Sequence, residues 1–103
     1  MTESIAQNEI VDIEAYANQG KIPPLSSQGY LIKVNGKSFV VNEPFPTGRK
    51  ILEVAYLLPP ENYTLRVKIR GERPRKVELD EKVDLREKGV EKFKALPRDQ
   101  TEG

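Results

Sequence analysis

The chain contains no cysteine and no histidine. Their absence excludes disulfide bonds, thiol nucleophiles and Cys/His metal sites, and it removes the side chain that most often transfers protons near neutral pH. The sequence also has no apolar N-terminal segment behind basic residues, and no apolar run near the ~20 residues of a membrane-spanning helix. We therefore expect a cytoplasmic protein that is not an enzyme, holds no metal or cofactor, and does not bind a membrane.

The composition predicts a single small domain. The chain has 103 residues, and one domain usually takes roughly 100 to 200. With 37% hydrophobic and 32% charged residues it can bury a modest core beneath a well-solvated surface. The net charge of +1 is uneven: residues 1–28 hold four acidic residues and one lysine, a net −3, which leaves +4 for residues 29–103. This basic remainder suits acidic partners but is too weakly charged for a nucleic-acid-binding domain.

Residues 1–28 are predicted to be a flexible N-terminal leader. The stretch "NEIVDIEAYANQ" has helical spacing, with Asn8 as a cap and with Ile10, Ile13 and Ala17 near one face. An isolated helix of about a dozen residues is only marginally stable in water, and "GKIPPLSSQG" after it is typical of a linker. We favour a disordered leader with nascent helix over a helix that docks on a partner.

The stretch "YLIKVNGKSFVV" predicts a β-hairpin. Asn35-Gly36 between two β-branched runs is a strong hairpin signal, because a type I′ turn needs positive φ at both central residues. The alternation gives each strand one buried face, formed by Tyr30, Ile32 and Val34 on the first strand and by Phe39 and Val41 on the second.

The next segment, "NEPFPTGRKILEVAYLLPP", predicts a helix of two to three turns. Thr47 is a suitable N-cap, and Pro59 with Pro60 ends the helical pattern. Its apolar stripe consists of Ile51, Leu52, Ala55 and Leu58.

Three further strands follow the helix. "YTLRVKIR" alternates strictly between apolar and polar residues, "KVEL" is a short strand, and "VEKFKAL" is the last strand before Pro97. The order of hairpin, helix and strands favours an α+β protein with a β-grasp arrangement, a mixed sheet wrapped around one helix, in which the last strand lies parallel beside the first. Another small α+β fold is the alternative.

Four segments together resemble a known family: "YLIKVNGKSFVV", "TGRKILEVAYLLPPENYTLRVKIRG", "VELDEKVDL" and "GVEKFKALPRDQTEG". Over residues 30–103 the chain is similar to the bacterial multi-ubiquitin domain family, ubiquitin-like β-grasp domains encoded beside ubiquitin-type enzymes. The resemblance implies a β-grasp domain over residues 29–97 and a flexible conjugation tail over residues 98–103. The chain departs from the family pattern in two ways: it contains a single unit, and it ends Glu102-Gly103 rather than Gly-Gly.

The resemblance also implies a function as a protein modifier. Gly103 would be the acyl donor, activated by a ubiquitin-activating-type enzyme that binds ATP, and then passed to a conjugating-type enzyme and to a protein target. A deubiquitinase-like metalloprotease would be a further partner. Extended chain from Arg98 to Gly103 would reach about 20 Å, far enough to enter an enzyme active site. The tail contacts with the activating enzyme would come from Arg98, Asp99, Gln100, Thr101 and Glu102. A frayed chain end is the alternative interpretation of the same residues.

Two charged groups outside the tail need an interpretation. Arg66, Lys68 and Arg70 fall on the outward face of their strand. We hypothesise that this basic stripe docks on an acidic groove of the activating or conjugating enzyme, or on the acidic leader; a solvated sheet face is the simpler alternative. The acidic "ELDE", with Glu78, Asp80 and Glu81, lacks a glycine-hinged loop and is predicted to bind no metal.

Two other functions are compatible with a β-grasp domain. A sulfur carrier would convert the terminal carboxylate to a thiocarboxylate, although the missing Gly-Gly end counts against it. A β-grasp interaction module would bind partners without becoming attached to them.

Overall fold

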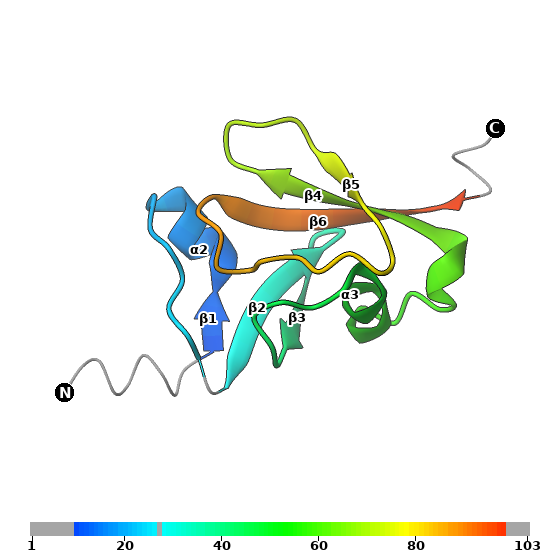
Figure 1. Ribbon diagram of the computed structural model, residues 1–103, viewed down its shortest axis with the longest axis horizontal. Helices are drawn as coiled ribbons and strands as arrows, with labels where there is room; N and C mark the ends of the chain where they lie inside the picture. The colour runs from blue at the N-terminus through cyan, green and yellow to red at the C-terminus, as the bar shows by residue number, and fades with distance from the viewer. Residues whose placement is uncertain (1–9, 27, 99–103) are drawn as a thin grey trace.

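The computed structural model describes residues 10–26 and 28–98. One mixed, six-stranded sheet packs against helix α3 (Gly48–Val54), as Figure 1 shows. Along the sheet the strands follow the order β1, β2, β6, β4, β5, and β3 pairs with β2 outside this path. The remaining elements are β1 (Ile10–Asp12), α2 (Ile13–Asn18), β2 (Gly29–Val34), β3 (Lys37–Val41), the 3-10 helix η1 (Pro60–Asn62), β4 (Tyr63–Ile69), β5 (Arg75–Val77) and β6 (Val90–Pro97). This arrangement confirms the predicted α+β fold of the β-grasp type.

The β2–β3 hairpin forms as predicted. Its strands pair antiparallel from Tyr30↔Val41 to Val34↔Lys37. The φ angles of Asn35 and Gly36 are 54° and 84°, the left-handed conformations that the turn requires. The predicted alternation also holds, because Tyr30, Ile32, Val34 and Val41 are buried and Phe39 is partly buried.

Helix α3 is shorter than its apolar stripe predicted. The Thr47 side chain caps it by accepting a hydrogen bond from the Lys50 amide at 3.1 Å. At its end Tyr56 takes a left-handed φ of 62°. The amide of Leu57 then donates to the carbonyl of Leu52 at 3.0 Å, a Schellman-type ending that reverses the chain. Leu58 is therefore not part of the buried stripe and is 58% exposed.

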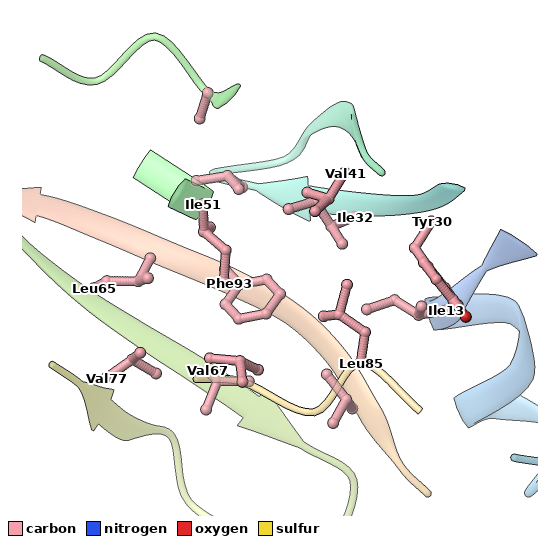
Figure 2. Close-up of a cluster of buried hydrophobic side chains, with 14 of the residues drawn as sticks. Ile13, Tyr30, Ile32, Val41, Ile51, Leu65, Val67, Val77, Leu85 and Phe93 are labelled. Atoms are coloured by element: carbon pink, nitrogen blue, oxygen red, sulfur yellow. The ribbon is translucent and has the colours of Figure 1, made fainter. Parts of the chain in front are cut away.

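The C-terminal strands complete the sheet. β6 lies between β2 and β4, parallel to β2 at Val34↔Phe93 and antiparallel to β4 from Tyr63↔Pro97 onward. The long connection between β5 and β6 crosses back over the core and is held by two hydrogen bonds, from the Val83 amide to the Pro46 carbonyl at 2.8 Å and from the Leu85 amide to the Pro44 carbonyl at 2.9 Å. Figure 2 shows that side chains from the hairpin, helix α3, this connection and the C-terminal strands meet in one cluster.

The N-terminal segment differs from the prediction of a leader outside the domain. Residues 10–26 lie against the sheet, because β6 pairs with β2 only at Val34 and leaves the edge of Gly29–Leu31 open for β1. Asp12 then caps α2, and the side chains of Ile13 and Ala17 enter the core. The domain boundary predicted at residue 29 is corrected accordingly: the described part of the domain begins at Ile10.

Polar contacts also hold this segment in place. Lys33 Nζ lies 2.8 Å from a carboxylate oxygen of Glu14, and this hydrogen-bonded ion pair raises the pKa of Lys33. The hydroxyl of Tyr30 donates to the Pro24 carbonyl at 3.0 Å, and Arg86 Nε donates to the Pro23 carbonyl at 3.2 Å. Among the described residues, no helix is long and apolar enough to cross a membrane.

Candidate functional site

The first part of the candidate site is the end of β6. This strand runs through the sheet to Pro97, where it pairs with Tyr63 at the start of β4, and Figure 1 shows its end at one side of the molecule. Arg98 follows and is half-buried. The other predicted tail residues, Asp99, Gln100, Thr101, Glu102 and Gly103, lie outside the described residues. Their contacts and the role of Gly103 stay predictions.

Asn35 of the hairpin turn holds β6 in position. Its side-chain amide donates to the Ala95 carbonyl at 3.1 Å, and its side-chain oxygen accepts from the Ala95 amide at 2.9 Å. The backbone amide of Asn35 also donates to the Phe93 carbonyl at 3.1 Å. Asparagine tolerates the left-handed backbone of the turn and also supplies a side-chain amide. The residue that signals the hairpin thus also fixes the strand that leads to the tail.

The structure divides the predicted basic stripe. The Arg66 side chain is exposed and makes no hydrogen bond or ion pair with another described residue. Lys68 Nζ donates to the backbone carbonyls of Ile69 and Glu72. Arg70 lies just after β4, 3.7 Å from a carboxylate oxygen of Glu91 and 3.4 Å from Oδ1 of Asn18. The stripe is therefore not one uniform row of solvated cations.

Sequence reasoning missed the cations that lie beside Arg66 on the neighbouring strands. The register places Lys94 of β6 and Lys76 of β5 directly opposite Arg66, and it places Lys92 opposite Lys68. Lys76, Lys92 and Lys94 are all exposed. The alternation in "VEKFKAL" indicated that Lys92 and Lys94 share a face, but only the register shows which residues they oppose.

A hollow of about 590 Å³ lies on this outer face of the sheet. We call it the basic cleft. Its lining includes Arg66, Lys68, Lys92, Lys94, Pro74 and Leu96. The Asn35-Gly36 turn contributes to the same lining, and none of the described residues that line the cleft is acidic. The cleft thus combines positive charge with apolar surface beside the strand that leads to the tail.

The acidic "ELDE" segment has a structural role in the fold. Oε2 of Glu81 lies 2.8 Å from Nη1 of Arg75, and Oε1 accepts a hydrogen bond from the Glu78 amide at 3.1 Å. The hydrogen bond from Arg75 is the main reason why the pKa of Glu81 is lowered, and the bond from the Glu78 amide adds to it. No group of three or more acidic, Cys or His residues with metal-site geometry occurs among residues 10–26 and 28–98.

The comparisons with known proteins identify the family. Searches of curated proteins and of solved structures found no match. A family profile, described as Multiubiquitin, matches residues 30–98, which run from β2 to the end of β6. This match covers most of the chain and includes the hairpin, helix α3 and the three C-terminal strands. The chain therefore belongs to the multiubiquitin family and contains a ubiquitin-like domain.

Proposed function

We propose that this protein is a ubiquitin-like protein modifier whose terminal Gly103 is joined to amines of target proteins. The observation that carries the proposal is the family match over residues 30–98, directly followed by a short polar segment that ends in glycine. The path of β6 supports it. The strand ends at Pro97, directly before tail residues 98–103 of the sequence, and Figure 1 shows the end of β6 at one side of the fold.

In the proposed reaction the carboxylate of Gly103 attacks the α-phosphate of ATP on an activating enzyme, which forms an acyl-adenylate and releases pyrophosphate. A cysteine thiolate of the enzyme attacks the acyl carbon and displaces AMP, and the thioester passes to a conjugating enzyme. A target amine then attacks the thioester carbonyl and releases the thiolate, so that one difficult acyl transfer becomes several easier steps. The catalytic side chains and the bound ATP belong to these partners, and this chain supplies the acyl group.

The tail residues suit this task on physical grounds. Glycine has no Cβ, so nothing crowds the acyl carbon when nucleophiles approach it in a narrow channel. Arg98, Asp99 and Glu102 offer charge-assisted contacts along such a channel. These roles rest on residue chemistry and on the family.

The experiment uses the arginine that precedes the tail. In cells that express the chain with an N-terminal epitope tag, trypsin cleavage after Arg98 leaves Asp-Gln-Thr-Glu-Gly on each acceptor lysine. We expect mass spectrometry of tagged adducts to find this remnant. Deletion of Gly103 should abolish the adducts, whereas Thr101→Ser, which keeps the length and the terminal glycine, should preserve them.

Two outcomes would contradict the proposal. Adducts that persist after deletion of Gly103 would show that another group makes the bond. Free chain that carries one sulfur in place of one oxygen, with no remnant on any target, would indicate the sulfur carrier instead.

A further inference from the structure

We propose that the basic cleft binds an acidic, extended segment of a partner protein. The inference does not depend on the acyl-donor proposal, since Gly103 takes no part in it. It starts from the arrangement of charge on strands β4, β5 and β6.

The register concentrates positive charge on one face. Lys76, Arg66 and Lys94 lie directly opposite one another across three neighbouring strands. Lys68 and Lys92 form a second opposed pair, two residues away from Arg66 on β4 and from Lys94 on β6. Like charges placed directly opposite on a sheet oppose folding, because their side chains lie close together on the same face. The domain therefore keeps an arrangement that is unfavourable in the isolated chain.

The charges on this face are poorly neutralised. Within the part of the chain that the structure describes, Arg66, Lys92 and Lys94 make no ion pair, and Lys76 lies 3.9 Å from Glu78. Three cations elsewhere in the described chain have a close acidic partner. The nitrogen to oxygen distances are 2.8 Å for Lys33 and Glu14, 2.7 Å for Arg49 and Glu61, and 2.8 Å for Arg75 and Glu81. The basic cleft thus retains a positive potential that an anionic partner would neutralise.

The cleft also offers apolar surface. Leu96 points to the outer face and is 38% exposed, and Pro74 lies in the lining at the other side. At the centre of the cleft, β4 pairs with β5 from Leu65 to Val67 and with β6 along its other edge, and the second edge of β6 is taken by Val34 at Phe93 and by the Asn35 side chain at Ala95, so an additional strand cannot pair there. An occupant must therefore lie over the face and contact it through side chains.

The spacing of the cations matches an extended peptide. Residues two apart on a strand project from the same face about 6.6 to 6.8 Å apart, which is the separation expected for Lys92 and Lys94 and for Arg66 and Lys68. Carboxylates on alternate residues of an extended segment have the same repeat, and apolar residues of that segment can contact Leu96 and Pro74.

The observations favour an acidic protein segment over a nucleic acid. Single-stranded nucleic acids are usually held by aromatic side chains on which bases stack. Among the described residues of the lining, Phe93 is the only aromatic one, and it is buried on the core side of β6. The net charge of +1 is also small for a domain that neutralises several phosphates.

The test uses a fluorescein-labelled peptide of twelve residues that alternates glutamate with serine. We expect it to bind the full chain at low salt, to weaken steeply as salt rises, and to shift NMR amide signals of β4 and β6 most. A peptide of the same composition, with its glutamates in one block, should bind at least threefold more weakly. A twelve-nucleotide oligothymidine should bind more weakly than the alternating peptide.

Two double variants with the same net charge distinguish binding in the basic cleft from a nonspecific effect of charge. Arg66→Glu with Lys94→Glu should reduce affinity for the alternating peptide at least tenfold. Lys50→Glu with Lys88→Glu makes the same change in net charge at exposed lysines outside the cleft lining, and it should change affinity less than twofold. A single Arg66→Glu variant places a carboxylate between Lys76 and Lys94, so its melting temperature should not fall. This keeps a loss of binding distinct from unfolding.

Equal losses in the two double variants, shifts confined to other strands, or tighter binding of the oligothymidine would overturn the proposal. Deletion of Gly103 should leave peptide binding unchanged. Failure of conjugation and failure of this inference are therefore separate results.

Discussion

Replacing Asn35 should loosen the strand that carries the C-terminal segment. In Asn35→Ala the side-chain hydrogen bonds of 3.1 and 2.9 Å to the Ala95 carbonyl and amide are lost. Each such bond contributes about 0.5 to 1.5 kcal/mol, so this loss amounts to about 1 to 3 kcal/mol. Alanine must also adopt the left-handed φ of 54°, which adds about 1 kcal/mol. We expect the free energy of unfolding to fall by about 2 to 4 kcal/mol.

A second variant separates the two contributions. Asn35→Gly loses the same side-chain bonds but adopts positive φ without strain, so it should be more stable than Asn35→Ala by about 1 kcal/mol. Urea unfolding would measure both variants, and hydrogen exchange should show faster exchange of the Ala95 amide in each. The reasoning is refuted if Asn35→Ala unfolds within about 0.5 kcal/mol of the parent, or if exchange at Ala95 is unchanged.

Two further predictions concern the N-terminal segment and the β5–β6 connection. Ile13 is 0% exposed and Ile10 is 49% exposed. In urea unfolding, Ile13→Ala should therefore lower the free energy of unfolding by about 2 to 5 kcal/mol, and Ile10→Ala by no more than about 1 kcal/mol. Similar losses in the two variants would show that residues 10–26 do not belong to the core. The pKa of Glu81 in the folded protein is lowered from its ordinary value of 4.5, chiefly by the hydrogen bond from Arg75. The ionised Glu81 carboxylate therefore stabilises the fold at pH values above its pKa in the unfolded chain. This stabilisation is lost as the pH falls through its pKa in the folded protein. Glu81→Gln should therefore be less stable than the parent at pH 7, with a difference that shrinks below about pH 4.5; a constant difference from pH 7 to pH 3 would contradict the assignment.

Local patterns predicted most of the sheet and its helix. The Asn35-Gly36 turn, the Thr47 cap and the alternation in "YTLRVKIR" each depend on neighbouring residues, and each has the predicted conformation. The position of β6 beside β2 followed from the handedness of crossover connections. It is confirmed by the parallel pairing at Val34↔Phe93.

Features that depend on distant partners were not visible in the sequence. A short helix with few apolar members is not stable alone, and residues 10–26 pack only because β2 has an open edge beside β6. Likewise, Val83 and Leu85 lie in a connection without regular structure, yet both are core residues. The left-handed Tyr56 that ends α3 is a position where glycine is the usual signal.

The candidate site was also predicted only in part, because one of its features is local and the other depends on distant residues. The outward direction of Arg66 and Lys68 followed from alternation along one strand. Their position opposite Lys94 and Lys92 required the register between β4 and β6, which lie more than twenty residues apart in sequence. The basic cleft is therefore a product of tertiary pairing.

The most direct test of the proposed function is an ATP-dependent transfer assay with a ubiquitin-activating-type enzyme that recognises this chain. The full chain should form an adduct with the enzyme that is cleaved by thiols and by hydroxylamine, and deletion of Gly103 should eliminate it. An adduct that forms equally well without Gly103 would contradict the proposal that the terminal carboxylate is the reactive group.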